Sequence, residues 1–566
     1  MKRLEQACYL ILSFYFLFSF TSCSDDSKEE PSDVPVIEFD QSEYFVKIGE
    51  SITLVPKVDK AVNPVFSWTV GGKIVSTETT YTFHADKLDE AFVNFKVVAK
   101  NGITEVQVKV TVTERDVPVI TLADTQMAYI GKEIKIAAEV AFTDNTTEFT
   151  WYKGNEIVCR DSIYTFKSDV ANADIEMLLK VTNKSGVVSK SFMIVVMPEP
   201  TPILFFDNGT YILPSELNDK TQMRKMSVCL GRSLVLAPVK MNMGDNITYE
   251  WKVDGMTQSG VTGEYFSFKP EKNGLYQITV TGRSEVGEAV ANVRVECVES
   301  EGTYRRERDE NSKYWANTCF QFIPAPGQFI DFQEGSTFAD ATAFINNQIK
   351  DVFYSGYVAS LGAFGGYAIF GFDHSVDNLE GPDLIMYGNE FVGSNEPGVV
   401  WVMQDENGNQ LPDDTWYELK GSETGKPETN QRATMTYFRP NKDNASIVWV
   451  SNVGTSGTIG NNGYHTQKSY FPMFITEESY TLTGTLLKNT FTSSGLEMNN
   501  NLDWGYVDNI NSRVGFYIED AIQQDGSPAN LKYIDFVKVH TGQQAKGQAI
   551  GEISTEPSTP QDYHMR

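Results

Sequence analysis

The sequence predicts an all-β, multidomain protein: tandem β-sandwiches followed by a larger, jelly-roll-like β-sandwich with one short helix. The first observation is an internal repeat of about 85 residues in the first half of the chain. The second is the alternation of apolar and polar residues in short runs bounded by Gly, Asn and Asp, which is typical of half-buried strands. The third is the high aromatic content of 12%, which favours β-structure.

The repeat is visible in the residues themselves. Asp33–Ile37 (Asp-Val-Pro-Val-Ile) recurs unchanged as Asp116–Ile120, and a third copy begins at Pro202. Each copy continues with a strand that a glycine introduces: Gly49–Leu54, Gly131–Ile136 and Gly231–Leu236.

A tryptophan follows at the same place in every copy, as Trp68, Trp151 and Trp251. A buried tryptophan on the third strand is the core residue expected of an immunoglobulin-like sandwich. The copies resemble PKD-like domains over residues 35–298. Such an array is either a semi-rigid stalk that lifts a distal domain from the surface, or a set of domains that bind glycan or protein themselves.

The beginning of the chain has the pattern of a secretion signal. Met1–Arg3 is positively charged, and Tyr9–Phe20 is apolar but shorter than the roughly 20 residues that a membrane span needs. Cys23 follows small residues, which resembles a bacterial lipobox and implies that its thiol carries the lipid anchor. The alternative is an ordinary cleaved signal with an incidental cysteine.

An acidic run follows Cys23. Ser24–Glu30 contains no core-forming residue and is expected to be a solvated tether. It resembles the surface-export signal of Bacteroidetes lipoproteins, which implies a lipid-anchored protein on the outer face of the outer membrane. Lipid is then its only membrane anchor.

Charge and cysteine content narrow the partners. With 47 Lys+Arg against 75 Asp+Glu the net charge is −28, which disfavours nucleic acid as a partner. After Cys8 and Cys23, four cysteines remain, and their spacing fits no zinc site. Cys229 and Cys297 lie near the first and last strands of one predicted domain, so they form either a disulfide or two buried thiols.

A charge-rich stretch separates the repeats from the rest and is predicted to be a linker. Beyond it, Ser336–Val352 is the one good helix pattern, with Ser336 as the expected N-cap. The predicted organisation is: 1–22 signal peptide, 23–34 tether, 35–114, 115–198 and 199–298 three PKD/Ig-like domains, 299–314 linker, and 315–566 the C-terminal ligand-binding sandwich.

One loop of the C-terminal domain has the residue types of a calcium site. It joins the predicted strands 399–403 and 415–419, and it places Asp and Asn at alternate positions around a glycine. Ca²⁺ prefers six to eight such oxygens. The candidate ligands are Asp405, Asn407, Asn409, Asp413 and Asp414. A polar hairpin turn is the alternative.

Two further strands are predicted to end in polar residues. One carries Asp373 and His374, and the other ends at Asn389. These side chains either meet at a common rim or serve ordinary turn chemistry. A Gly/Asn-rich loop at 452–465 ends in Tyr464 and His465 and has no phosphate-binding pattern.

These stretches carry a second resemblance. Gly-Phe-Asp-His, Gly-Asn-Glu-Phe, Glu396–Pro–Gly, Asp-Glu-Asn-Gly-Asn and the closing Gly551–Glu556 resemble Bacteroidetes "cell surface protein" lipoproteins over about residues 315–560. The resemblance implies surface capture of a cobamide (vitamin B12) beside a TonB-dependent transporter.

A corrin is broad, flat and fringed with amides, so it calls for aromatic platforms and amide groups. The candidate ligand-binding residues are Tyr464, His465, Trp504, Tyr506, Asn389 and His374. Either histidine could ligate cobalt, whereas tryptophans on strands are more often core.

No sequence motif supports catalysis. The chain has five histidines and lacks the patterns of zinc proteases and serine hydrolases. We therefore expect a non-enzymatic cobamide receptor. The alternative is a glycan-binding or glycan-degrading lipoprotein, because a glycosidase carboxylate pair is spaced in three dimensions and not along the sequence.

Overall fold

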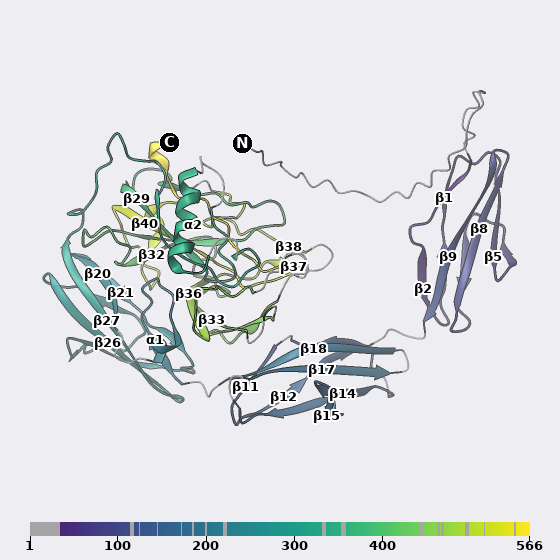
Figure 1. Ribbon diagram of the computed structural model, residues 1–566, viewed down its shortest axis with the longest axis horizontal. Helices are drawn as coiled ribbons and strands as arrows, with labels where there is room; N and C mark the ends of the chain where they lie inside the picture. The colour runs from purple at the N-terminus through teal and green to yellow at the C-terminus, as the bar shows by residue number, and fades with distance from the viewer. Residues whose placement is uncertain are drawn as a thin grey trace. The chain divides into compact units, whose positions relative to one another are not determined.

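The computed structural model describes residues 34–113, 118–123, 125–143, 145–170, 173–183, 186–197, 201–218, 223–330, 335–351, 358–440, 443, 445–460, 465, 469–492, 497–513, 515–547 and 551–566 (Figure 1). Cys23 and the signal pattern lie outside these ranges. None of the helices within them is both long and apolar enough to span a membrane.

The three repeats fold into β-sandwiches with one shared topology, as the repeat predicts (Figure 1). Sandwich 1 has a five-stranded sheet in the order β2-β9-β8-β5-β6 and the strand pairs β3-β7 and β1-β4. Its strands are β1 Val36–Glu38, β2 Glu43–Lys47, β3 Ser51–Leu54, β4 Lys57–Asp59, β5 Val65–Val70, β6 Lys73–Ser76, β7 Tyr81–His84, β8 Glu90–Ala99 and β9 Gly102–Thr113.

Sandwich 2 repeats this order as β11-β18-β17-β14-β15 with β12-β16 and β10-β13. In each sandwich one pair of the large sheet is parallel: β2 with β9, β11 with β18, and β20 with β27. Pairs such as β8–β9 and β12–β16 are antiparallel. The strands are β10 Val119–Thr121, β11 Thr125–Tyr129, β12 Glu133–Ala137, β13 Glu139–Ala141, β14 Glu148–Lys153, β15 Glu156–Cys159, β16 Ile163–Lys167, β17 Ala173–Asn183 and β18 Gly186–Met197.

Sandwich 3 has the order β20-β27-β26-β23-β24 with β21-β25 and β19-β22, and it adds a short helix, α1. Its elements are β19 Ile203–Phe205, α1 Pro214–Asn218, β20 Arg224–Leu230, β21 Leu234–Leu236, β22 Val239–Met241, β23 Thr248–Val253, β24 Met256–Thr257, β25 Phe266–Phe268, β26 Gly274–Ser284 and β27 Gly287–Ser300.

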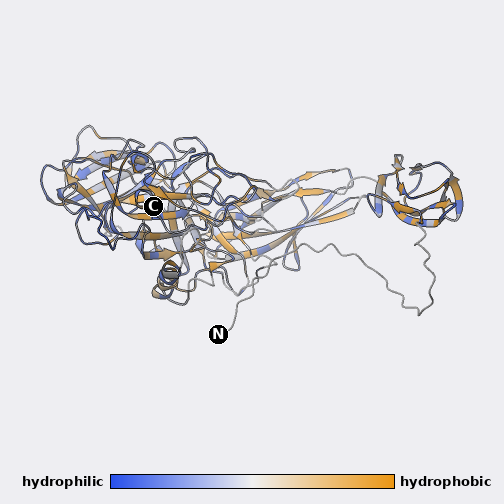
Figure 2. Ribbon diagram, turned by 90° about the horizontal axis from the view of Figure 1, so that it is seen from above, coloured by the Kyte–Doolittle hydropathy of each residue, from blue (hydrophilic) through white to orange (hydrophobic). Residues whose placement is uncertain are grey.

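Alternation along the strands builds each core. Hydrophobic and hydrophilic residues follow one another along the long strands in Figure 2. Trp68, Trp151 and Trp251 are fully buried, which confirms them as core residues. Each indole N–H donates to a backbone oxygen ten to twelve residues later, at 2.8 to 2.9 Å, so its one polar atom is satisfied.

Cys229 and Cys297 are buried free thiols. In the parallel pair of β20 and β27, Cys229 lies opposite Val298, and Cys297 lies opposite Val228. Neighbouring residues on a strand point to opposite faces, so the two thiols lie on different sides of the sheet. The disulfide alternative is wrong for this reason.

The C-terminal domain is a sandwich of a six-stranded sheet, β28-β29-β40-β31-β32-β39, and a four-stranded sheet, β35-β34-β33-β36. One hydrophobic core fills the space between the sheets, and a second lies between the six-stranded sheet and helix α2. Its elements are β28 Thr318–Ile323, α2 Phe338–Asp351, β29 Tyr367–Asp377, β30 Leu384–Ile385, β31 Gly398–Met403, β32 Trp416–Leu419, β33 Asn430–Phe438, β34 Ile447–Ser451, β35 Ser456–Ile459, β36 Ser479–Leu486, β37 Phe491–Thr492, β38 Met498–Asn499, η2 Ile518–Asp520, β39 Ala521–Ile522, β40 Tyr533–Thr541, β41 Gln561–Asp562 and η3 Tyr563–Met565.

Helix α2 begins two residues later than predicted. The hydroxyl of Thr337 accepts the backbone N–H of Asp340 at 3.1 Å, so Thr337 is the N-cap. Ser336, the residue before this cap, donates its backbone N–H to the Asp340 carboxylate at 3.2 Å. The expected N-cap role of Ser336 is therefore corrected to its neighbour, while Ala341, Ile345 and Ile349 form the buried stripe.

The charge-rich segment 299–314 is held against the C-terminal domain, with which sandwich 3 shares one compact unit. Arg305 donates two hydrogen bonds to Asp377, at 2.6 and 2.7 Å. Arg306 pairs with the fully buried Asp535 at 2.9 Å. Two of the charges that predict a linker, on Arg305 and Arg306, are thus used in ion pairs.

Candidate functional site

Four carboxylates from three distant stretches of the chain gather in the C-terminal domain. Glu396, Glu552 and Glu556 line a cavity of about 160 Å³. Asp508 completes the group, because one oxygen from each of Asp508, Glu396 and Glu556 lies within 4.8 Å of the other two. Glu396 precedes β31, Asp508 follows β38, and both other glutamates follow β40.

Backbone and side-chain donors hold two of these carboxylates. Asp508 accepts the backbone N–H of Asn389 at 3.0 Å and that of Glu556 at 2.8 Å. Glu556 accepts the hydroxyl of Ser360 at 2.9 Å and the side-chain amide of Asn389 at 2.6 Å. These four donors are N–H or O–H groups without charge, so they orient the carboxylates without neutralising them.

The other two carboxylates are held by one backbone donor each. Glu396 accepts the N–H of Ser554 at 2.9 Å, and Glu552 accepts that of Gln328 at 2.7 Å. The second oxygen of Glu552 is buried and has no hydrogen-bond partner among the described residues, and the same holds for one oxygen of Glu390. Of these two residues only Glu552 lines the cavity, which therefore has one unused acceptor.

Burial disfavours the charged form of the whole group. It raises the pKa of Glu552 to about 8 and, for Glu556, to about 7. Burial, followed by repulsion from Glu556, also raises the pKa of Glu396 and of Asp508. The group is thus poorly stabilised as four bare anions and favours a proton or a cation.

A short hairpin beside the cavity presents apolar side chains to solvent. Phe391 and Ser394 exchange two backbone hydrogen bonds, at 3.1 and 2.8 Å, and Gly393 turns the chain between them with φ +88°. Phe391 is 65% exposed and Val392 is 86% exposed. Because Ser394 lines the cavity, this apolar tip is anchored at its edge.

Two of the predicted ligand residues lie at or next to this cavity. Asn389 lines it and is exposed. The ring of His465 packs edge-on against Phe329, another lining residue, with ring centroids 4.6 Å apart. Tyr464 lies outside the described residues. Residues distant in sequence are thus brought to one region by the fold.

The remaining predicted ligand residues lie in other surroundings. Tyr506 is buried, and its hydroxyl accepts the backbone N–H of Glu423 at 3.0 Å. Trp504 is half-buried, and the guanidinium of Arg513 lies 4.2 Å from its ring centre and 4.3 Å from that of Tyr517. One face of Trp504 is therefore already covered by a cation.

His374 is wholly buried inside β29, which continues past the predicted strand end. Its ring nitrogens contact Asp373 at 2.8 Å and Asp562 at 3.1 Å. Burial lowers the pKa of His374, but the hydrogen bonds to Asp562 and Asp373 outweigh it, so the net shift is upward. The sequence predicts that His374 and Asn389 either meet at a common rim or serve turn chemistry. Among the described contacts the two residues have no partner in common.

In the predicted calcium loop, carboxylates accept hydrogen bonds from amide groups of the same loop. Asp405 is buried and accepts the backbone N–H groups of Gly408, Asn409 and Gln410 at 2.8 to 3.1 Å. A cation at this carboxylate would have to share its oxygens with those three donors.

The other predicted ligands in this loop also bond to one another. Asp414 accepts the side-chain amide of Asn407 at 2.9 Å, and Asp413 accepts that of Asn409 at 3.0 Å. The five residues do lie together in one loop, but their oxygens face N–H donors. A calcium ion here stays a prediction.

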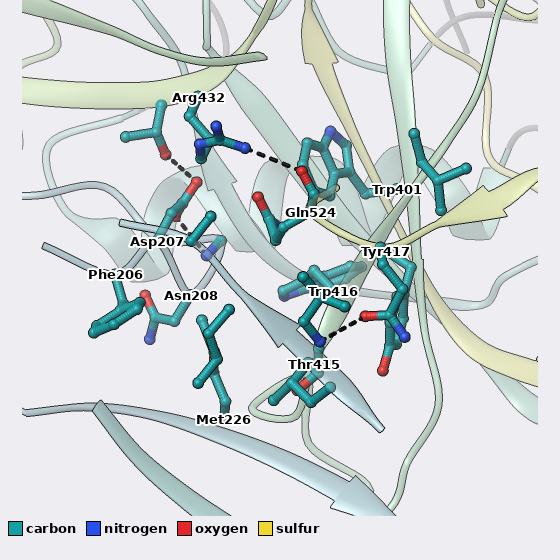
Figure 3. Close-up of a pocket in the computed structure, with 18 of the residues that line it drawn as sticks. Phe206, Asp207, Asn208, Met226, Trp401, Thr415, Trp416, Tyr417, Arg432 and Gln524 are labelled. Atoms are coloured by element: carbon teal, nitrogen blue, oxygen red, sulfur yellow. Dashed lines mark hydrogen bonds between the residues drawn. The ribbon is translucent and has the colours of Figure 1, made fainter. Parts of the chain in front are cut away.

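A second, smaller cavity lies where sandwich 3 meets the C-terminal domain (Figure 3). It holds about 40 Å³, and Trp401, Trp416 and Lys538 line it. The indole N–H groups of both tryptophans are buried without a hydrogen-bond partner in the described chain. A space of this size suits one or two water molecules and no larger ligand.

The carboxylate group escaped prediction from single residues, although three of its members lie in motifs that resemble the surface lipoproteins. Glu396 belongs to the Glu–Pro–Gly motif, and both Glu552 and Glu556 belong to the closing motif. Gly388 packs so closely on Asp508 that an added Cβ would lie 2.3 Å from the carboxylate. Both motifs contain acidic residues and glycine, and this shared composition is the sequence signal that points to the carboxylate group.

Comparisons with known proteins agree with the sandwich repeat. Residues 34–99 match the model of the PKD-like domain, and residues 222–297 match that of the PKD domain. No curated protein sequence matches the chain.

Among solved structures, the chain is similar to tandem domain arrays. Titin I-band fragment I67–I69 is 12% identical, covering 46% of this chain and 97% of that one at a TM-score of 0.15. Drosophila OTK extracellular domains 3–5 are 13% identical, covering 46% of this chain and 96% of that one at a TM-score of 0.17. The fibronectin(III)-like modules of Clostridium thermocellum CbhA are 16% identical, covering 29% of this chain and 95% of that one at a TM-score of 0.17. The two family matches and the three sandwiches of one topology, and not these weak structural likenesses, are what show tandem PKD-like domains, an organisation that fits a surface protein.

Proposed function

We propose that this chain is a non-enzymatic ligand-capture protein displayed on a cell surface, with the C-terminal domain as the capturing module. The observation that carries the proposal is the exposed apolar tip of Phe391 and Val392 at the edge of a cavity lined by carboxylates, one of which, Glu552, has an unused acceptor oxygen. Apolar platforms that border a few convergent polar groups are typical of ligand sites.

In this proposal Cys23 carries the lipid that tethers the chain to the outer membrane, and the sandwiches act as the spacer. The support is the order of signal pattern, small residues, cysteine and acidic run. Replacement Cys23→Ala is expected to release the chain from the membrane fraction. Retention of the variant in that fraction would contradict the tether.

The ligand that the resemblance to surface lipoproteins implies is a cobamide, destined for a TonB-dependent transporter. Its corrin ring is flat and carries primary amides, whose N–H groups can donate to carboxylates such as Glu552 and Glu556. The cavity of about 160 Å³ is smaller than the roughly 300 to 1,000 Å³ of most small-molecule pockets. It would therefore accept a side arm, while the ring lies across Phe391.

A glycan is the second candidate, because sugar hydroxyls also donate to carboxylates and sugar faces stack on aromatic rings. We propose binding without cleavage in either case, because no sequence motif of the chain supports catalysis.

Calorimetric titration of the purified chain with cyanocobalamin tests the proposal. Micromolar binding is expected, and a double variant Asn389→Ala with Phe391→Ala should weaken it at least about tenfold. Phe92→Ala is the matched control, because Phe92 is 52% exposed on sandwich 1. It should leave the affinity unchanged.

Absence of cyanocobalamin binding at micromolar concentration would remove the cobamide. Glycan binding that the same double variant weakens would then support the second candidate. Release of shortened sugars from a glycan by the wild-type chain would contradict the non-enzymatic role.

A further inference from the structure

We infer that Glu396, Asp508 and Glu556 form a binding site for a divalent cation, and that Ca²⁺ is the cation whose preferences they fit best. This site is distinct from the loop 405–414, where the sequence predicts calcium. The inference concerns the protein and the metal alone and does not depend on the identity of a captured ligand.

The spacing of the oxygens suits a single ion. The three carboxylates each place an oxygen within 4.8 Å of the other two. Ligands at 2.3 to 2.6 Å from one Ca²⁺ are at most about 5 Å apart when they lie on opposite sides of the ion. One cation between them can therefore approach all three.

Uncharged donors hold these carboxylates, and no lysine or arginine of the described ranges forms an ion pair with them. Asp508 accepts two backbone N–H groups and Glu396 accepts one. The charged neighbours that act most strongly on Glu396 and Asp508 are other carboxylates. Metal-ligating carboxylates are usually hydrogen-bonded themselves, and a carboxylate has about four acceptor positions, so these oxygens keep capacity for an ion beside their donors.

An independent observation points to a missing partner in the same cavity. Glu552 is 3% exposed and lines the cavity, yet its Oε2 accepts no hydrogen bond in the described chain. A buried acceptor without a partner costs about 1–3 kcal/mol. Direct ligation of a cation, or a water molecule bound to it, would satisfy this atom.

The cavity can supply the rest of the coordination sphere. Its volume is about 160 Å³, and a water molecule takes about 30 Å³ of liquid volume, so a hydrated ion fits. Three or four carboxylates plus waters approach the six to eight oxygens that Ca²⁺ takes. The group contains neither His nor Cys, which disfavours zinc, and Mg²⁺ is usually held by only one or two carboxylates.

Calcium binding to the purified, chelator-treated chain tests the inference, with calcium content measured after equilibrium dialysis and the melting temperature measured with and without CaCl₂. We expect Ca²⁺ to bind and to raise the melting temperature. The isosteric variants Glu396→Gln and Glu556→Gln should each bind one ion fewer than the wild type and lose that rise. Asp413→Asn, in the exposed part of the loop 405–414, is the matched control and should keep both.

The variants remain informative if calcium is absent. Neutralising one of several crowded carboxylates removes repulsion, so both glutamine variants should melt in chelator at or above the wild-type temperature, which shows that they fold. A wild-type chain that binds no calcium at millimolar concentration would overturn the inference. So would glutamine variants that retain the wild-type stoichiometry, or loss of the ion in Asp413→Asn alone.

Discussion

Sandwich 1 and sandwich 3 are built on the same repeat but present different surfaces. Trp68 and Trp251 are both fully buried, and each donates its indole N–H to a backbone oxygen at 2.9 Å. The turns that precede β3 and β21 both need a glycine, since Gly49 and Gly231 have φ of +85° and +94°. The core and the turn are thus the same in both copies.

The residues around that turn differ. Glu50, directly after the first glycine, is exposed, whereas its counterpart Arg232 donates to Gln404 at 2.8 Å and to the backbone oxygen of Ala529 at 2.6 Å. On the next strand, Thr53 of sandwich 1 is exposed and Val235 of sandwich 3 is 7% exposed.

Sandwich 3 therefore has a second buried face, which packs against the C-terminal domain, in addition to its own core. Three of three residues in β21 are buried, whereas β3 alternates. In a tandem repeat, positions that the copies share indicate the common core, and positions where one copy departs from alternation indicate docking. Sandwich 3 belongs with the C-terminal domain in any fragment intended to bind ligand.

The largest effect on stability is expected from replacing Arg232, the residue that follows Gly231 in the turn before β21. Arg232→Glu would place a carboxylate beside Glu301, which Arg232 now contacts at 3.4 Å, and would leave Gln404 and Ala529 without their donor. Breaking a buried ion pair in this way typically costs about 3–5 kcal/mol. Urea unfolding of the full chain, followed by tryptophan fluorescence, should show the transition of sandwich 3 and the C-terminal domain at lower urea.

The reverse exchange in sandwich 1 is the control. Glu50→Arg alters an exposed side chain and should change stability by no more than about 0.5 kcal/mol. If Arg232→Glu also left stability unchanged, the polar contacts of Arg232 would not stabilise the docking of sandwich 3 on the C-terminal domain. The difference between the two sandwiches at this position would then have no energetic consequence.

Much of the fold followed from the sequence because its signals are local. The repeated tryptophans, the glycine turns and the period-2 alternation predict the sandwiches, and the apolar stripe of 338–349 predicts α2. The N-cap was missed by one residue because Ser336 and Thr337 have the same capping chemistry. The charged segment 299–314 was predicted to be a linker, because the partners of its arginines, Asp377 and Asp535, lie far away in the sequence.

The carboxylate group could not be predicted for the same physical reason. Asp508 and Glu556 are 48 positions apart, yet a backbone N–H of one residue bonds the carboxylate of the other. The loop 405–414 attracted attention because its oxygens are close in sequence, but local amides suffice to occupy them. Motifs that resembled the surface lipoproteins did mark Glu396 and Glu556, without showing that they meet.

A smaller effect is expected from Lys538 of the C-terminal domain, whose contact with sandwich 3 makes stability depend on pH. Lys538 is 4% exposed, donates to the backbone oxygen of Gly209 in sandwich 3 at 2.7 Å, and lies 4.3 Å from the centre of the Tyr367 ring. Burial lowers the pKa of Lys538 to about 8 from 10.5. The folded chain therefore releases this proton at a lower pH than the unfolded chain does.

Between pH 8 and 10.5 the unfolded state binds more protons at this site, so the group's contribution to stability rises with pH and falls as pH is lowered. A shift of this size corresponds to about 3 kcal/mol at most. In Lys538→Met this rise should disappear from urea unfolding curves compared at pH 8 and pH 10, while the loss of the hydrogen bond to Gly209 lowers stability at both. An unchanged rise in the variant would assign the pH dependence to other groups, and it would show that sandwich 3 docks on a lysine that keeps its charge.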